Sequence, residues 1–134
     1  MKNIFIAFIL LSVSAFAQLE QVWATPQFTQ SGIKIIDIRT PEEWKETGII
    51  QDSYTITFFD QRGNFNIEAF LDQLNNVVKK EEQFALVCRV GSRTGMVSEF
   101  LSDRLGYHVI NLKGGIMKMI QEGYQTVPYK NKLD

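Results

Sequence analysis

Four short runs of apolar and β-branched residues recur along the chain, and each is typical of a strand buried in a sheet. They are residues 33–38, 53–57, 84–87 and 108–111. Between these runs the apolar positions change to the spacing of a helix. The alternation predicts an α/β fold with crossover connections, and therefore a small, mainly parallel sheet with helices on both faces.

The predicted helices are marked by residues that favour helix ends. Thr25-Pro26 and Thr40-Pro41 each place a capping residue before a proline. We expect one short helix that stops near Gly32 and a second that ends at Gly48, because glycine favours the end of a helix. Three longer helices are expected at about 66–78, 94–105 and 116–122.

The helix expected at 94–105 follows the third strand and is amphipathic. Met96, Val97, Phe100 and Leu101 recur at helical spacing, so we expect all four to lie on its buried face. Gly106 is expected to cap its end. This helix matters because the segment that leads into it contains the most distinctive chemistry of the chain.

The first residues have the pattern of a secretory signal. Lys2 is positive, residues 4–11 are an unbroken apolar run, and Ala15-Phe16-Ala17 fits the small-residue cleavage pattern. Cleavage after Ala17 would leave residues 18–134 as one exported domain, periplasmic or extracellular. The competing interpretation is a retained membrane anchor, but the uncharged stretch 4–19 is shorter than the roughly 20 residues of a spanning helix.

Composition excludes several classes of function. The net charge is −1 and no run of Lys or Arg occurs, so nucleic acid is not an expected partner. The chain has one cysteine, Cys88, and one histidine, His108, which are too few for an internal disulfide or a structural zinc site. We expect no metal and no organic cofactor. The sequence does not indicate an oligomeric state.

Cys88 lies where a parallel sheet usually places its functional groups. It follows the strand at 84–87 and precedes a helix, and ligands of such sheets bind beyond the carboxyl ends of the strands. Asp37 and Arg39 lie at the end of the strand at 33–38 and are expected at the same edge. An exposed lone thiol in an exported protein is open to oxidation. Cys88 is therefore expected to be either buried and inert or retained for its chemistry.

The segment after Cys88 has the composition of an anion cradle. It consists of Arg89, Val90, Gly91, Ser92 and Arg93. The first N–H groups of a helix lack internal partners and carry partial positive charge, so a loop curled here can aim several of them at one anionic atom. Glycine permits the close approach, and the two arginines add positive charge. Such surroundings favour a thiolate, which is the form that attacks sulfur.

The residues around this loop have alternative interpretations. Arg93 could contact a substrate, but pairing with a nearby acid to fix the backbone is favoured. Arg89 could face an anionic substrate or be a solvated surface residue. His108 begins a predicted strand with no acid to orient it, so a catalytic role is disfavoured. Cys88 itself could be an inert core residue at a strand end.

Three segments together resemble the rhodanese-like domain family. They are Cys88-x-x-Gly91-x-Arg93, Asp37-x-Arg39-x-x-x-Glu43-Trp44, and Leu112-x-Gly114-Gly115 followed by Glu122-Gly123-Tyr124. Their order and spacing also fit the family, and together they cover about residues 20–127. The resemblance implies a parallel sheet of about five strands between helices. It also implies that Asp37 supports the site from beneath and that Gly114-Gly115 brings a second loop near Cys88.

The resemblance implies a sulfurtransferase. Cys88 would accept sulfane sulfur from a small anionic donor such as thiosulfate, and the backbone from Arg89 to Arg93 would cradle it. The persulfide would then pass its sulfur to cyanide or a thiol, in two-step covalent catalysis. Two alternatives remain: a non-catalytic binding or sulfur-sensing module, and a phosphatase-like or redox cysteine enzyme. Related phosphatases have a loop one residue longer, and no second cysteine is present to resolve a disulfide.

Overall fold

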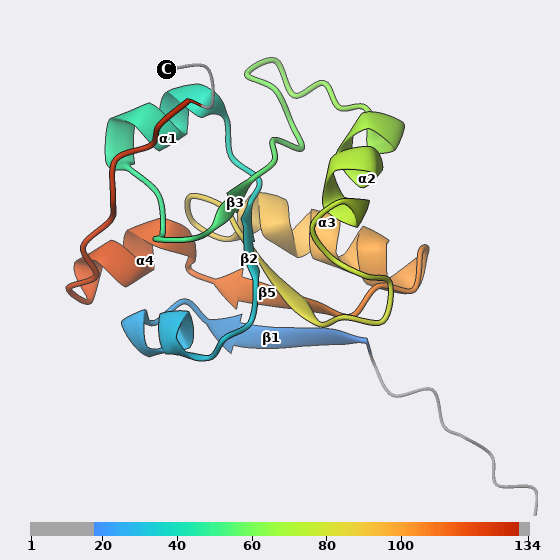
Figure 1. The fold of residues 1–134 in the computed structure, drawn as a ribbon, viewed down its shortest axis with the longest axis horizontal. Coiled ribbons are helices and arrows are strands. Elements are labelled where there is room, and N and C mark those ends of the chain that lie inside the picture. Colours follow the sequence, from blue (N-terminus) through green and yellow to red (C-terminus); the bar gives the residue numbers. More distant parts are fainter. Residues whose placement is uncertain (1–17, 132–134) are drawn as a thin grey trace, which may run out of the picture.

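A single parallel sheet forms the centre of the molecule. The computed structural model describes residues 18–131 (Figure 1). Its strands are β1 (Leu19–Trp23), β2 (Ile35–Asp37), β3 (Tyr54–Thr55), β4 (Phe84–Val87) and β5 (Val109–Lys113). They are arranged in the order β1-β5-β4-β2-β3, and every pair is parallel. The carboxyl ends of all five strands therefore share one edge of the sheet.

Helices cover both faces of the sheet, as the alternating pattern predicts. They are the 3-10 helix η1 (Pro26–Gln30) and the α-helices α1 (Pro41–Thr47), α2 (Ile67–Asn75), α3 (Ser92–Asp103) and α4 (Gly115–Gln121). One core cluster joins α2 and α3 to the sheet through side chains such as Phe70, Leu74 and Leu101. A second cluster, on the other face, includes Ile116 and Met119 of α4.

The central strand β4 is buried along its whole length. Each of its four residues has a relative exposure of 0%. It lies between β2 and β5, with Ala85 opposite both Ile35 and Ile110. Because the flanking strands hold β4 on both sides, the residue that follows it starts from a fixed position. That residue is Cys88.

Helix α1 begins and ends where the sequence predicts. Thr40 is its N-cap and accepts a hydrogen bond from the backbone N–H of Glu43, and Pro41 is its first residue. Gly48 ends the helix at φ 75°, a conformation that glycine adopts without strain. Thr25 stands at the corresponding position of η1, but its side chain makes no capping hydrogen bond. The predicted end signals are therefore correct, but the side-chain cap occurs only at Thr40.

The C-terminal segment returns to α1 after α4 (Figure 1). Val127 and Ile49 exchange two backbone hydrogen bonds of 2.9 Å in an antiparallel bridge. The Thr126 hydroxyl donates to the carbonyl of Thr47, and the ring of Tyr129 packs against Trp44 at 5.0 Å between centroids. These contacts fasten the end of α1 from outside the sheet.

Two details of the pattern-based prediction are wrong. The strand β1 was not assigned, because only Leu19 and Val22 of its five residues turn even partly inward. Met96 was expected on the buried face of α3, but its side chain is 60% exposed. The buried face of α3 is instead formed by Thr94, Val97, Ser98, Leu101 and Ser102. Three of these buried residues are small and carry a hydroxyl group, so the apolar pattern did not identify them.

The predicted signal peptide and its cleavage after Ala17 lie outside the described residues, which begin at Gln18. Within residues 18–131, no helix has the length and apolar character needed to cross a membrane.

Candidate functional site

Cys88 lies at the carboxyl end of β4 with its sulfur enclosed by its own loop. The residue is 0% exposed. The backbone N–H of Gly91 donates to Sγ at 3.2 Å, and the hydroxyl of Thr94 lies 3.4 Å from Sγ. Gly91 adopts φ 99° and is the N-cap of α3, so the loop turns back on the sulfur at the start of the helix. The loop and the first turn of α3 thus place one backbone N–H group and one hydroxyl against Sγ.

Gly114 and Gly115 bring the last loop against the Cys88 loop. The N–H groups of Ile116 and Met117 donate to the carbonyls of Cys88 and Arg89, at 2.9 and 3.1 Å. Gly115 is at φ 66°, and a Cβ atom on it would lie 2.3 Å from the Arg89 carbonyl oxygen. Only glycine fits this approach. The N-terminus of α4 thus fixes the outer side of the loop through backbone contacts alone.

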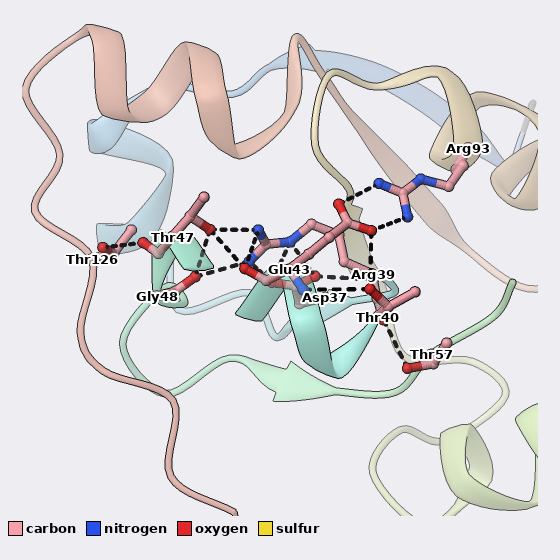
Figure 2. A network of polar contacts seen from close by, with 9 residues as sticks. All are labelled: Asp37, Arg39, Thr40, Glu43, Thr47, Gly48, Thr57, Arg93 and Thr126. Carbon is pink, nitrogen blue, oxygen red and sulfur yellow. Dashed lines mark hydrogen bonds and ion pairs between the residues drawn. The ribbon is translucent and has the colours of Figure 1, made fainter. Parts of the chain in front are cut away.

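Arg93 is paired with an acid on a different helix. Its guanidinium forms a bidentate ion pair with Glu43 of α1, with N–O distances of 2.6 and 2.7 Å (Figure 2). Figure 2 shows the Glu43 carboxylate reaching from α1 toward the start of α3. A planar fork of this kind holds both partners in orientation. The pair therefore ties the first turn of α3 to α1.

The ion pair changes the titration of both groups. Burial by itself would raise the pKa of Glu43, but the hydrogen bonds and charge of Arg93 outweigh it, with further contributions from Thr40 and Arg39, and the pKa lies below its usual value. The hydrogen bonds to Glu43 raise the pKa of Arg93, opposed by burial and supported by the charge of Glu43. Arg93 is therefore a neutralised cation, and its main partner is within the protein.

Asp37 and Arg39 form a second ion pair, which is fully buried. Arg39 donates to both Asp37 oxygens at 2.8 to 3.2 Å, and both side chains are 0% exposed. The same guanidinium donates to the Thr47 hydroxyl at 2.7 Å and to the Gly48 carbonyl at 2.9 Å (Figure 2). The pair thus joins the end of β2 to the end of α1. It supports the scaffold that presents Glu43, and neither side chain is exposed to a substrate.

The opposite side of the loop is basic and more open. Val90 is 58% exposed and Arg89 is partly exposed. Lys113 is the last residue of β5, and its ammonium lies 4.1 Å from the ring centroid of Trp23, which is itself 55% exposed. Within residues 18–131, neither Arg89 nor Lys113 forms an ion pair. This side of the site therefore has positive charge that no carboxylate of the described chain neutralises.

His108 is remote from this chemistry. It precedes β5, whose first residue Val109 pairs with Phe84, the first residue of β4. Cys88 follows the last residue of β4, so the two residues lie at opposite ends of the strands, about 17 Å apart along the strand axis. No group of three or more potential metal ligands occurs within residues 18–131.

Two residues of the site were not singled out from the sequence. Thr94 touches the sulfur, and Glu43 is the partner of Arg93. The sequence predicts an acid near Arg93 but does not name it. Glu43 belongs to the Asp37-to-Trp44 segment that resembles the family, and this motif is the signal that could have identified it. The contact of Thr94 depends on the tight turn at Gly91, which composition alone does not specify.

Comparison with known proteins places these features in a family. The rhodanese-like domain profile matches residues 20–122. The mitochondrial Protein HIGH ARSENIC CONTENT 1 of Arabidopsis thaliana is 26% identical over 105 residues, which are 77% of this chain and 62% of that protein. This chain therefore spans less than two thirds of the length of that relative.

Solved structures show the same fold. A rhodanese-related protein from Thermoplasma volcanium gives a TM-score of 0.59 at 26% identity, covering 77% of this chain and 91% of that one. A rhodanese-like domain protein from Staphylococcus aureus gives a TM-score of 0.61 at 23% identity, covering 84% and 99%. These likenesses show the fold, and the profile match, which covers more than half of the chain, shows that the protein belongs to the rhodanese-like domain family.

Proposed function

We propose that the protein is a sulfurtransferase in which Cys88 carries sulfane sulfur as a persulfide. The observation that supports this most directly is the cradle around Sγ. An N–H group from Gly91 already points at the sulfur, and the following residues start helix α3, whose first N–H groups lack internal partners. An anionic sulfur bound at this position would be stabilised in the same way as Sγ.

The proposed reaction has two steps. In the first, the Cys88 thiolate attacks the outer sulfur of a donor such as thiosulfate, a sulfur–sulfur bond forms on Sγ, and sulfite leaves with the electron pair of the broken bond. In the second, a nucleophile such as cyanide or a thiolate attacks the outer sulfur, and Cys88 leaves as a thiolate. No external oxidant or reductant is needed, because each step is an exchange at sulfur.

The charges around the loop support an anionic donor. Arg89 belongs to the Cys88 loop, and the Cα atom of Lys113 lies 3.7 Å from the Cβ position of Gly91; neither side chain forms an ion pair within the described chain. Positive charge at the mouth of a site raises the local concentration of an anion. Because Cys88 is fully buried, the donor must also be small, or must present its sulfur at the end of a narrow group.

The test is the intact mass of the protein before and after incubation with thiosulfate, with Cys88→Ser as the matched control. We expect a gain of about 32 Da, removed by cyanide or dithiothreitol and absent in the variant, because only an activated thiolate exchanges sulfur in this way. A variant that retained full transfer activity would show that Cys88 is not the carrier.

The complete burial of Cys88 favours one second candidate, a non-catalytic binding or sulfur-sensing module. In that case the wild type would gain no sulfur from any donor, and Cys88 would alkylate slowly at neutral pH, as an unactivated thiol does. Hydrolysis of a generic aryl phosphate at rates near those of sulfur transfer would instead favour a phosphatase-like enzyme.

A further inference from the structure

An open groove lies beside the first turn of α3, the helix that follows the Cys88 loop. It has a volume of about 630 Å³ and lies between α1, the loop after Phe58 and the first turns of α3. A neighbouring hollow of about 340 Å³ shares Thr40, Glu42, Asp60 and Gln61 with it, so the depression continues past the N-terminus of α1. Its length suits an extended segment of chain better than a small molecule.

The groove has an apolar part and an acidic wall. Phe59 and Met96 contribute apolar surface, and Met96 is 60% exposed although it belongs to a helix of the core. Glu42, Glu46 and Asp60 contribute carboxylates, and all three are exposed. Two positive side chains line the depression: Arg93, which Glu43 neutralises, and Arg62 in the neighbouring hollow. Carboxylates outnumber guanidinium groups along it, so the groove carries net negative charge.

The three carboxylates of the groove differ in their structural roles. Glu42 lies in the first turn of α1, where the helix dipole favours a carboxylate, and Asp60 accepts hydrogen bonds from the backbone N–H groups of Arg62 and Asn64. Glu46 lies in the last turn of α1, where the helix dipole disfavours a carboxylate. Glu42 and Glu46 stand four residues apart on α1, where like charges lie on one face and destabilise a helix. Neither forms an ion pair within residues 18–131. An exposed apolar side chain beside unpaired carboxylates is the composition expected of a surface that a cationic, partly apolar partner covers.

The groove also reaches the first turn of α3, the helix that follows the Cys88 loop. Arg93 lines the groove, and the next residue, Thr94, lies 3.4 Å from Cys88 Sγ through its hydroxyl. Figure 2 shows the Glu43 carboxylate joined by dashed lines to both Thr40 and Arg93. A segment lying in the groove would bring its own side chains next to the Cys88 loop.

We propose that this groove binds a segment of an acceptor protein that has basic and apolar residues beside a cysteine. This inference rests on the proposed sulfur transfer and names the acceptor class. The acceptor thiolate attacks the outer sulfur of the Cys88 persulfide. A bond forms between the acceptor sulfur and the outer sulfur, the bond between the outer sulfur and Sγ breaks, and Cys88 leaves as a thiolate. The basic side of the site serves the anionic donor, and the acidic groove serves the cationic acceptor.

The test compares two synthetic peptides of equal length, each with one cysteine and one leucine. Lysines flank the cysteine in the first peptide, and glutamates flank it in the second. The persulfide is formed on the wild type and quantified by mass before a peptide is added, so that only the second step is timed. We expect the lysine peptide to accept sulfur about tenfold faster at low salt. The difference should shrink near 1 M salt, where the screening length falls to about 3 Å.

The decisive variant is Glu42→Gln with Glu46→Gln, which removes two exposed charges. Glu68→Gln with Asp72→Asn is the matched control, because these carboxylates are also exposed, four residues apart on α2, and outside the groove. The lysine and glutamate peptides differ in the intrinsic reactivity of their thiols, but that difference is the same in the assays of the wild type and of both double variants. We therefore expect the preference to fall in the first variant and to persist in the control. An equal preference in both variants would overturn the inference.

A binding measurement separates this inference from the proposed function. The lysine peptide with serine in place of cysteine is labelled and its anisotropy is followed with the unmodified protein. We expect binding that the Glu42→Gln/Glu46→Gln variant weakens by about threefold to tenfold, the range for two exposed ion pairs. Such binding without any persulfide on the wild type would retain the groove and reject sulfur transfer. Persulfide formation without selective binding or transfer would retain the Cys88 persulfide and reject the groove as the acceptor site.

Discussion

At the scale of single residues, the site depends on glycines that allow two loops to touch. Gly115 combines a positive φ with a contact that leaves no room for a methyl group, because its Cβ would lie 2.3 Å from a backbone oxygen of Arg89. Gly91 contacts the same loop, because a Cβ atom on Gly91 would lie 3.0 Å from the backbone nitrogen of Gly114. The position of the Cys88 loop is thus set by backbone packing that side chains cannot replace.

We expect Gly115→Ala to destabilise the protein by about 2–4 kcal/mol, since it adds both backbone strain and overpacking. Gly32→Ala is the matched control, because Gly32 also has a positive φ (78°) but no atom lies within 4 Å of its Cβ position. It should cost only about 1–2 kcal/mol. Denaturant unfolding measures both, and equal losses would show that the contact with Arg89 is unimportant.

The identity of the site residues was more predictable than their contacts. Cys88, Gly91 and Arg93 stand out because a strand-to-helix loop rich in glycine and arginine has few structural explanations. The role of Thr94 depends on a turn whose geometry is set by Gly91 and by contact with Gly114, which lies 23 residues further along the chain. Such a contact between distant segments leaves no local pattern.

At the scale of elements, two ion pairs hold α1 in place. The Glu43–Arg93 pair links it to α3, and the Asp37–Arg39 pair links its C-terminal end to β2. The first pair is partly exposed, with 19% and 24% of the two side chains accessible, and the second is fully enclosed. The two pairs should therefore respond differently to pH and to substitution.

The Glu43–Arg93 pair gives a pH dependence whose sign is fixed. The pKa of Glu43 is lowered in the folded state. The contribution of the ion pair to the free energy of unfolding is therefore fully present above the usual pKa of 4.5, and it is lost as pH falls through the lower folded pKa. We expect about 1–2 kcal/mol, the range for a charge-assisted contact near the surface.

The measurement is unfolding of the wild type and of Glu43→Gln between pH 7 and pH 3. The wild-type advantage should be constant at neutral pH and should decline in the acid range. Glu82, whose pKa is lowered mainly by its hydrogen bond to Lys34, titrates in the same range in both proteins and cancels in the difference. An advantage that persisted at pH 3 would contradict the assignment.

We expect that breaking the Asp37–Arg39 pair lowers the free energy of unfolding more than breaking the Glu43–Arg93 pair. Arg39→Met leaves the Asp37 carboxylate buried without its partner, and we expect a cost of about 3–5 kcal/mol. Adding Asp37→Asn should restore part of this stability, because the uncompensated charge is then removed. Thermal unfolding of the single and double variants measures the coupling, and additive losses would mean that the two side chains act independently.

Elements with strong end signals were predicted well, and those defined by packing were not. Helix α1 has both a capping threonine and a terminal glycine, and its bounds follow from them. Strand β1 lies at the edge of the sheet, so most of its side chains face solvent and the apolar alternation is weak. In α3, Ser98 and Ser102 are buried because they bring the helix close to the sheet, and no polarity scale assigns them to a core.

At the scale of the whole molecule, the residue that follows the predicted cleavage site is already bound to the sheet. Gln18 already accepts a hydrogen bond from Val109 at 2.8 Å, one residue after Ala17. We propose that residues 1–17 are removed during export. Expression in a host with a secretion pathway should give an intact mass that corresponds to residues 18–134. A secreted or membrane-associated product with the full-length mass would contradict the proposal.

The order of strands has a consequence for how the chain folds. Within residues 18–131, β1 is the first strand to be synthesised and has β5 as its only neighbour, and Leu19 pairs with Val109 at a separation of 90 residues. Contacts of such long range form late, because the entropy of closing the intervening chain is lost before they form. The N-terminal strand therefore stays unpaired until nearly the whole domain has been made. An enzyme that cuts beside Gln18 would reach an open chain at that stage, and folding would then close over the cut end.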